Sequence, residues 1–415
     1  MNRSQWQPHP VLLILAIISI GFILRGSIVA VAPIVGEISS DLSLNAAQAG
    51  LLTSVPVLCF ALMTPLASLL VGRAGANFAT TIAIVGVGAG SIVRSAGGIE
   101  AVLVGTILMG AFITIGNVVI PVIIRRDISA ERVGIVTGAY TSALNVGSMI
   151  TTLGTVPLAG VLGWRGALLA WVGFVVLAAA AWLIAVGPRR AFHWGPFRSA
   201  LETGAFETVA IDTRGLPVAR PEPRTWRSLS AIFLALAFGA QAFSYYGLTA
   251  WFPTILEQEL DYSAGQAGAS SSIFQIAAVV GALGVPLLSR RFGIPKTFAL
   301  VSALWISLPV GMIFAPAGWF VWGFLGGVAQ GGGIRIVFML VVQLALSGTH
   351  ARRLSAMVQG VGYAIGATAA ILVGAVHDAT GTWTLPIGVV LISTMVFTVA
   401  GLAGALRASG PRRRR

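Results

Sequence analysis

Charged residues are scarce in this chain of 415 residues: they make up 9% of it, and only 13 of them are Asp or Glu. Because a soluble domain contains about 25% charged residues, the composition excludes an ordinary soluble protein. Cysteine occurs once, as Cys59, which excludes a disulfide framework and a cysteine-based metal site. The four histidines lie outside the long apolar segments. We therefore predict neither a metal centre nor a cofactor.

Apolar residues are abundant instead, at 56% of the chain, and the mean hydropathy is +0.91. They form segments of about the 20 residues that a helix needs to cross a bilayer. These segments are too long and too continuously apolar for barrel strands, so we expect an all-α membrane protein. Twelve transmembrane helices are predicted, at residues 11–33, 48–72, 79–95, 99–123, 133–160, 166–187, 230–254, 267–288, 297–314, 318–346, 355–376 and 384–406.

The stretch 188–229 differs from its surroundings because it contains Arg, Glu, Pro and Gly between the sixth and seventh predicted helices. We expect an N-terminal six-helix bundle at 1–187, a cytoplasmic linker at 188–229 and a C-terminal six-helix bundle at 230–407. A basic cytoplasmic tail at 408–415 ends the chain.

The basic residues fall mainly on the side of the predicted helices that carries the N-terminus. Cytoplasmic loops are rich in Lys and Arg, so both termini are predicted to be cytoplasmic in a bacterial inner membrane. Arg94 and Arg165 are the two basic residues assigned to the outer side. Topology accounts for the net charge of +13, so no nucleic-acid partner is predicted. The expected partners are the lipid bilayer and a small-molecule substrate, and a self-contained twelve-helix unit makes a monomer the default.

The two halves resemble each other at a nearly constant offset. Asn45-Ala-Ala-Gln-Ala-Gly50 recurs as Ser263-Ala-Gly-Gln-Ala-Gly268, 218 residues later, and Trp164 recurs as Trp383 after 219 residues. Such parallel repeats bind their substrate between the halves near the membrane midplane, and the halves rock to expose it alternately to the two sides.

Two arginines, Arg25 and Arg335, interrupt long apolar segments, where a guanidinium costs at least ~2.5–3.5 kcal/mol. No acidic residue lies within a predicted span, so neither has an obvious carboxylate partner. The repeat offsets match Arg25 with Tyr245 and Arg335 with Asn117. We predict that these four side chains face a wet cavity in which the arginines bind an anion. The alternative is structural: bonds to helix carbonyls for the arginines, and interhelical hydrogen bonds for Asn117 and Tyr245.

Further polar side chains are candidates for the same cavity, with a packing role as the alternative for each. They are Tyr140, Asn145, Gln241, Tyr246, Gln275, Gln330, Gln359 and Tyr363. A guanidinium presents a planar fork of donors that suits carboxylate-like or small planar anions.

The predicted spans lack the acid or histidine that usually forms an intramembrane proton relay. We therefore expect anion exchange, facilitated movement, or a proton carried on the substrate. Glu37, Asp41 and Asp378 are the acidic candidates at the outer mouth.

Several motifs resemble the major facilitator superfamily and, more closely, its cyanate and nitroimidazole transporter branch (CynX/NimT). They are Leu24-Arg25 followed by Val31-Ala-Pro33, Gly50-Leu-Leu-Thr-Ser-Val-Pro56, Gly116-Asn-Val-Val-Ile-Pro-Val-Ile-Ile-Arg-Arg126, Tyr245-Tyr246 with Trp251-Phe252-Pro253, and Gln359-Gly-Val-Gly-Tyr363. The chain departs from the family pattern at Leu70-Val-Gly-Arg-Ala-Gly75, which lacks the usual acidic residue, and at Gly26, where the motif usually has Pro. The resemblance implies secondary transport, within a branch that spans uptake of small anions and export of nitroheterocycles.

Together these features predict a secondary active transporter for a small anionic or anion-like polar solute, such as cyanate, nitrite or a short carboxylate. It would work by alternating access, with Arg25 and Arg335 as the main ligands. The alternative is an exporter of nitroimidazole-like or other drug or metabolite molecules. A membrane enzyme would require a buried acid, a histidine pair or a large extramembrane loop, none of which the sequence shows, so an enzyme is not predicted.

Overall fold

The computed structural model describes residues 10–195, 228–345 and 348–409, and within them every regular element is a helix. The first half contains α1 (Pro10–Val29), η1 (Ala32–Ile34), α2 (Val35–Leu42), α3 (Ala46–Ala74), α4 (Ala76–Ser95), α5 (Ile99–Asp127), α6 (Val133–Ala170), α7 (Val172–Val186) and α8 (Pro188–Ala191). The second half contains α10 (Leu229–Leu260), α11 (Ala264–Phe292), α12 (Ile294–Phe314), η3 (Pro316–Gly318), α13 (Trp319–Leu344), α14 (Gly348–Ala367), α15 (Ala369–Thr380) and α16 (Thr384–Ser409).

Within the described ranges, eleven helical stretches are long and apolar enough to cross a membrane. One of them, Val133–Val186, has 54 residues and would be about 80 Å long as a straight helix, far more than a bilayer needs. Gly163 breaks it with φ +68° and ψ 167°, a conformation that glycine adopts without strain. The stretch therefore contains two crossings, and the prediction of twelve transmembrane helices is confirmed.

Several predicted helices have different ends in the structure, and two of them differ by an interruption. The first was expected to run to residue 33, but α1 ends at Val29 and the chain continues through η1 into α2. Pro33 lacks the backbone N–H that would bond to the Val29 carbonyl oxygen in a continuous α-helix. The eleventh was expected at 355–376, whereas α14 and α15 together run from Gly348 to Thr380 with an interruption at Thr368. Most of the predicted linker and tail lies outside the described residues, so the division of the chain into four segments stays a prediction.

The repeated sequence motif forms the same local structure in both halves. Asn45 caps α3 by accepting from the Gln48 backbone N at 2.8 Å, while Gln48 Oε1 accepts from the Asn45 backbone N at 3.0 Å. Ser263 and Gln266 form the equivalent capping box at the start of α11. A capping box satisfies two backbone N–H groups that a helix start otherwise leaves free. The repeated sequence motif therefore marks the start of a helix in each half.

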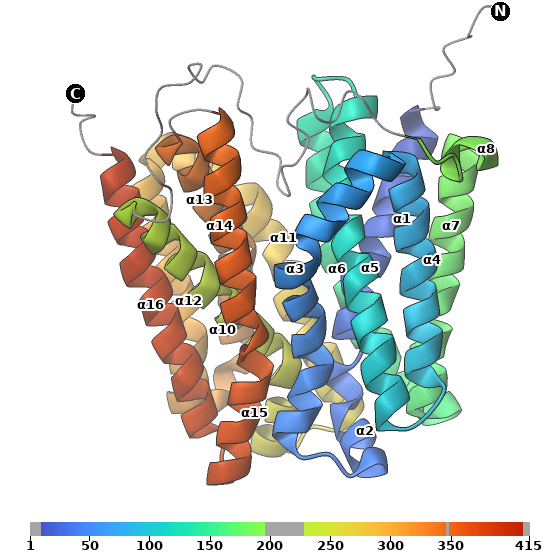
Figure 1. The fold of residues 1–415 in the computed structure, drawn as a ribbon. Helices are drawn as coiled ribbons and strands as arrows, with labels where there is room; N and C mark the ends of the chain where they lie inside the picture. Colours follow the sequence, from blue (N-terminus) through green and yellow to red (C-terminus); the bar gives the residue numbers. More distant parts are fainter. Residues whose placement is uncertain (1–9, 196–227, 346–347, 410–415) are drawn as a thin grey trace, which may run out of the picture.

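The two halves lie side by side, with α3 and α6 of the first against α14, α15 and α11 of the second (Figure 1). A Cβ at Gly50 would come within 2.5 Å of the Ala370 carbonyl oxygen, and one at Gly268 within 3.3 Å of the Thr152 carbonyl oxygen. Gly50 corresponds to Gly268, and Thr152 to Ala370, at the repeat offset of 218. The interface between the halves is therefore pseudo-symmetric, and glycine allows the helices to approach closely.

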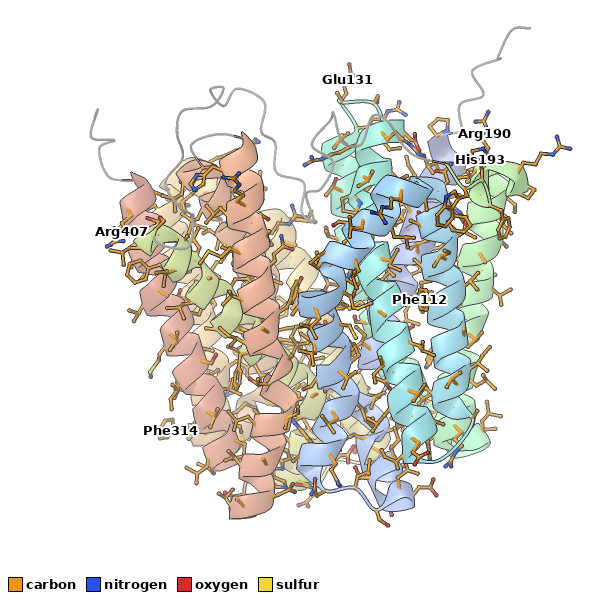
Figure 2. The ribbon with its side chains drawn as sticks, viewed as in Figure 1. Phe112, Glu131, Arg190, His193, Phe314 and Arg407 are labelled. Atoms are coloured by element: carbon orange, nitrogen blue, oxygen red, sulfur yellow. The ribbon has the colours of Figure 1, made fainter. Side chains whose placement is uncertain are left out.

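One end of this interface carries an additional polar contact. The carboxylate of Asp378, in α15, accepts hydrogen bonds from the backbone N of Ala46 at 3.1 Å and of Ala47 at 3.0 Å, in the first turn of α3. The contact lies at the end where α2 and α15 are found in Figure 1. Glu131, Arg190 and Arg407 lie at the opposite end of the helices (Figure 2). The halves are thus joined at the end remote from these charged residues.

Candidate functional site

A cavity of about 210 Å³ lies between the two halves and is lined by residues of both. Both predicted arginines line it, together with four of the five tyrosines of the chain. The predicted candidates that the structure brings together there are Arg25, Asn117, Tyr140, Asn145, Tyr245, Tyr246, Gln330, Arg335 and Tyr363. No acidic residue is among the described residues that line the cavity.

Three candidates do not line this cavity. Gln359 lies on α14, and its Nε2 donates to Ser355 Oγ one turn away at 2.7 Å, which corrects its expected position at the site. Gln275 lies next to a lining residue, and its Oε1 accepts a hydrogen bond from the Tyr245 hydroxyl at 3.5 Å. Gln241 is fully buried and donates to the backbone oxygen of Gln330 at 3.4 Å. All three amides are thus engaged by neighbouring protein groups.

Arg25 enters the cavity from α1. Its Nη1 donates to Asn145 Oδ1 on α6 at 3.1 Å, and its guanidinium carbon lies 4.7 Å from the centroid of the Tyr245 ring. A cation over an aromatic face is attracted by the ring quadrupole, most strongly where water is excluded. Two neutral groups therefore stabilise this guanidinium, and its positive charge is not cancelled.

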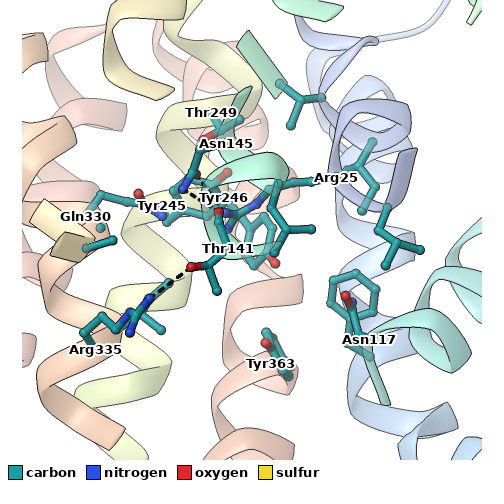
Figure 3. A pocket seen from close by; sticks show the side chains of 18 of the residues that line it. Arg25, Asn117, Thr141, Asn145, Tyr245, Tyr246, Thr249, Gln330, Arg335 and Tyr363 are labelled. Atoms are coloured by element: carbon teal, nitrogen blue, oxygen red, sulfur yellow. Dashed lines mark hydrogen bonds between the residues drawn. The ribbon is translucent and has the colours of Figure 1, made fainter. Parts of the chain in front are cut away.

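Arg335 enters from α13 in the other half, and its Nη2 donates to Thr141 Oγ1 at 3.0 Å (Figure 3). Thr141 was not among the predicted residues. It lies one helical turn before Asn145, the partner of Arg25, so the two arginines are held by successive turns of α6. The signal that would have found it is the spacing of four residues, which places Thr141 and Asn145 on one face of a helix.

Asn117 corresponds to Arg335 in the sequence repeat, but the two lie on opposite sides of the cavity (Figure 3). Asn117 Oδ1 accepts from the Tyr140 hydroxyl at 3.4 Å. The four repeat-related positions therefore line one cavity without forming a single ring of ligands.

Aromatic rings form much of the remaining wall. Tyr245 and Tyr246 pack edge to face with centroids 4.9 Å apart. Tyr363 on α14 packs in the same way against Phe60 on α3, at 5.5 Å, and this pair joins the two halves. Phe60 and Phe338 also line the cavity and were missed from the sequence, because apolar residues in an apolar span carry no distinguishing signal.

Arg94, which the sequence assigned to the outer side, lies in the last turn of α4 and is buried outside the cavity lining. It is 1% exposed, and its Nη1 donates to the Ser27 carbonyl oxygen in the last turn of α1 at 2.9 Å. That carbonyl is one of the unpaired groups at a helix end. Arg94 thus has the structural role that was the alternative for the cavity arginines.

Two of the three acidic candidates predicted at the outer mouth, Asp41 and Asp378, bind protein groups, whereas Glu37 lies in the first turn of α2. Asp41 Oδ2 accepts from Arg165 Nη1 at 2.8 Å and from Trp164 Nε1 at 3.1 Å, and Asp378 accepts from the start of α3. Both carboxylates therefore stabilise contacts between helices at this end of the molecule.

A twelve-helix fold with two repeated halves and a central cavity defines a class of membrane transporters. The sequence matches the family model described as Major Facilitator Superfamily over residues 15–352, and the chain belongs to this superfamily. A bacterial homologue of the human lysosomal transporter Spinster, solved in an inward-facing and occupied conformation, has a TM-score of 0.73 at 17% identity and covers 96% of each chain.

Within the superfamily, the chain is a transporter of the cyanate and nitroimidazole type. It is 32% identical to the 2-nitroimidazole transporter of Escherichia coli (strain K12) over 394 residues, 94% of this chain and 95% of the relative. It is 24% identical to the cyanate transport protein CynX of the same organism over 373 residues, 89% of this chain and 91% of the relative. These relatives are transporters and not enzymes, as expected from the sequence.

Proposed function

We propose that this protein is a secondary active transporter that moves a small anionic or anion-like polar solute across the inner membrane by alternating access. The single observation that carries this proposal is the pair Arg25 and Arg335, one from each half, in a cavity lined by no acidic residue among those described. Their recorded partners are neutral, and a buried charge is stable only when it is paired. A transported anion supplies the missing charge.

The distribution of the donors supports this assignment. A guanidinium carries five N–H groups and no acceptor. Within the described residues, Arg25 contacts Asn145, Tyr245 and Tyr246, and Arg335 donates to Thr141. The remaining donors are available to a ligand. Because one arginine comes from each half, a bound anion is contacted by both halves at once. Its binding therefore favours the arrangement in which the halves are close.

The distribution of charged residues supports an orientation of the protein in the membrane. The end of the helices with Glu131, Arg190 and Arg407 (Figure 2) is the cytoplasmic end if basic residues mark the inner side. Both termini are then cytoplasmic, and the contact between Asp378 and α3 closes the outer side. A monomer is sufficient for this mechanism, since both arginines belong to one chain.

A second candidate function is export of nitroimidazole-like molecules, which the walls of the cavity favour. Tyr245, Tyr246 and Phe60 line it, and stacking on aromatic rings suits a flat heterocycle. A volume of about 210 Å³ has room for a ring with a substituent, whereas one water occupies about 30 Å³ of the liquid. The nitro oxygens would then accept hydrogen bonds from the arginines.

The test is transport by purified protein in proteoliposomes, with cyanate, nitrite, acetate and 2-nitroimidazole as separate substrates. We expect at least one to be transported, and Arg25→Gln and Arg335→Gln each to reduce its rate at least tenfold. Arg290→Gln, at the end of α11 and outside the cavity lining, is the matched control and retains the parental rate. If both cavity variants transport as the parent does, the arginines are not ligands and the proposal is wrong.

A further inference from the structure

The hydrogen bond between Arg335 and Thr141 joins the two halves at the cavity. Arg335 belongs to α13 in the second half, and Thr141 to α6 in the first, 194 residues away in the chain. Both residues line the cavity, and Figure 3 shows the bond extending from the Arg335 guanidinium to the Thr141 hydroxyl. Any motion that separates α6 from α13 at this level must break it.

The Thr141 hydroxyl is itself held in one orientation. It lies 3.0 Å from the Gly138 carbonyl oxygen, to which it donates within the same helix, so its oxygen is left as an acceptor for Arg335. Valine removes this oxygen at nearly the same volume, whereas serine keeps it. The arrangement therefore specifies a hydroxyl at this position and not merely a side chain of this size.

Thr141 also links the two arginines through α6. Its backbone oxygen accepts from Asn145 Nδ2 at 3.2 Å, and Asn145 Oδ1 accepts from Arg25 at 3.1 Å. Thr141 and Asn145 thus connect Arg335 to Arg25 along α6, with the Thr141 hydroxyl bound to Arg335 and its backbone oxygen bound to Asn145. Both guanidinium groups are therefore bound to neighbouring turns of one helix.

We propose that Thr141 is a positioning residue: it orients Arg335 for the solute only while α6 and α13 are in contact, and so couples binding to the arrangement of the halves. This inference rests on the proposed function. A ligand shifts a conformational equilibrium only as far as its affinities for the two states differ. When the halves separate here, Arg335 loses its orienting partner, so the affinity of the site falls. Thr141 thereby supplies that difference by acting through Arg335.

The first test is equilibrium binding of cyanate, nitrite and 2-nitroimidazole to purified protein in detergent, by isothermal titration calorimetry. We expect Thr141→Val to weaken binding five- to twentyfold, and Thr141→Ser to bind within twofold of the parent. Arg335→Lys should weaken binding by a smaller factor in the Thr141→Val background than in the parent, because both changes affect one contact. Parental affinity in Thr141→Val, or equal losses in the valine and serine variants, would overturn the inference.

The second test needs no ligand and separates this inference from the proposed function. Spin labels are attached at Ile135→Cys on α6 and Gln343→Cys on α13, in a Cys59→Ser background, and their distance distribution is measured. We expect Thr141→Val to shift the ligand-free distribution towards longer distances, while Thr141→Ser leaves it unchanged. An unchanged distribution in Thr141→Val overturns the inference. If the parent binds none of the three solutes, the proposed function fails, and this measurement still decides the role of Thr141.

Discussion

Arg25 and Tyr245 occupy equivalent positions in the two sequence repeats and contact each other across the cavity. The guanidinium carbon lies 4.7 Å from the ring centroid, so the aromatic face stabilises the charge without neutralising it. A carboxylate at position 245 would form a permanent ion pair with the Arg25 guanidinium. The pairing of arginine with tyrosine therefore keeps the cation available to a ligand while making its burial tolerable.

Replacement of Tyr245 tests this contact. Phenylalanine keeps the ring face, whereas leucine removes it, and cation–π contacts contribute about 0.5–2 kcal/mol. We expect Tyr245→Leu to bind the transported solute roughly two- to thirtyfold more weakly than Tyr245→Phe, measured by titration calorimetry. Tyr262→Leu is the control, since Tyr262 is the one tyrosine that does not line the cavity. Equal affinities in the two Tyr245 variants would show that the ring face does not matter.

Asn145→Asp places a carboxylate beside Arg25, where the structure has a neutral amide 3.1 Å from Nη1. We expect this variant to lose transport of anionic substrates, because the internal carboxylate competes for the guanidinium, while its melting temperature stays at or above that of the parent. Asn145→Ala removes the partner instead and should lower the melting temperature, since an unpartnered buried charged group costs several kcal/mol. Both quantities are measured on the same preparations, and anion transport by Asn145→Asp at the parental rate contradicts the prediction.

Gly281 and Gly284 on α11 provide a matched pair for testing helix packing. A Cβ at Gly281 would come 1.8 Å from the Val328 carbonyl oxygen on α13, whereas one at Gly284 meets nothing within 4 Å. Gly281→Ala should therefore destabilise the protein by at least about 1–3 kcal/mol, the usual cost of overpacking, and Gly284→Ala should not. Thermal unfolding in detergent distinguishes them. A melting temperature that falls equally in both variants would attribute the effect to helix α11 itself and not to its contact with α13.

Asp378→Asn removes the negative charge that binds the first turn of α3. A charge at a helix N-terminus contributes about 0.3–1 kcal/mol when it is exposed, so the two halves should separate more often at this end. Ala49→Cys is a reporter, because Ala49 lies on α3 and is 1% exposed. We expect its thiol to react faster with a maleimide in the Asp378→Asn variant, in a Cys59→Ser background.

Asp41→Asn is the control for that measurement. Asp41 lies at the same end of the molecule, but it binds Trp164 and Arg165 within its own half. Its replacement should leave the reaction rate at Ala49→Cys unchanged. Equal rates in the Asp378→Asn protein and its parent would show that the carboxylate does not hold the halves together.

Local sequence signals predicted much of the fold. Apolar segments of membrane-spanning length depend only on residues within one helix length, and the structure shows that the repeated motifs at Asn45 and Ser263 begin helices. The offset between the halves matched Arg25 with Tyr245 and predicted that both face one cavity, and the structure adds their direct contact. The end of α1 at Val29 was misjudged because the hydropathy pattern continues across it, whereas the chain changes there from an α-helix to the short helix η1.

The sequence alone determined the class of protein, the number of its membrane helices, the repeat and the two arginines in apolar segments, because hydrophobicity and charge act over a single helix length. The tertiary structure alone decided what each buried arginine contacts: Asn145 and Tyr245 for Arg25, Thr141 for Arg335, and a helix carbonyl for Arg94. These contacts join residues far apart in the chain. They depend on how each helix is rotated and packed, and a local sequence pattern does not determine either.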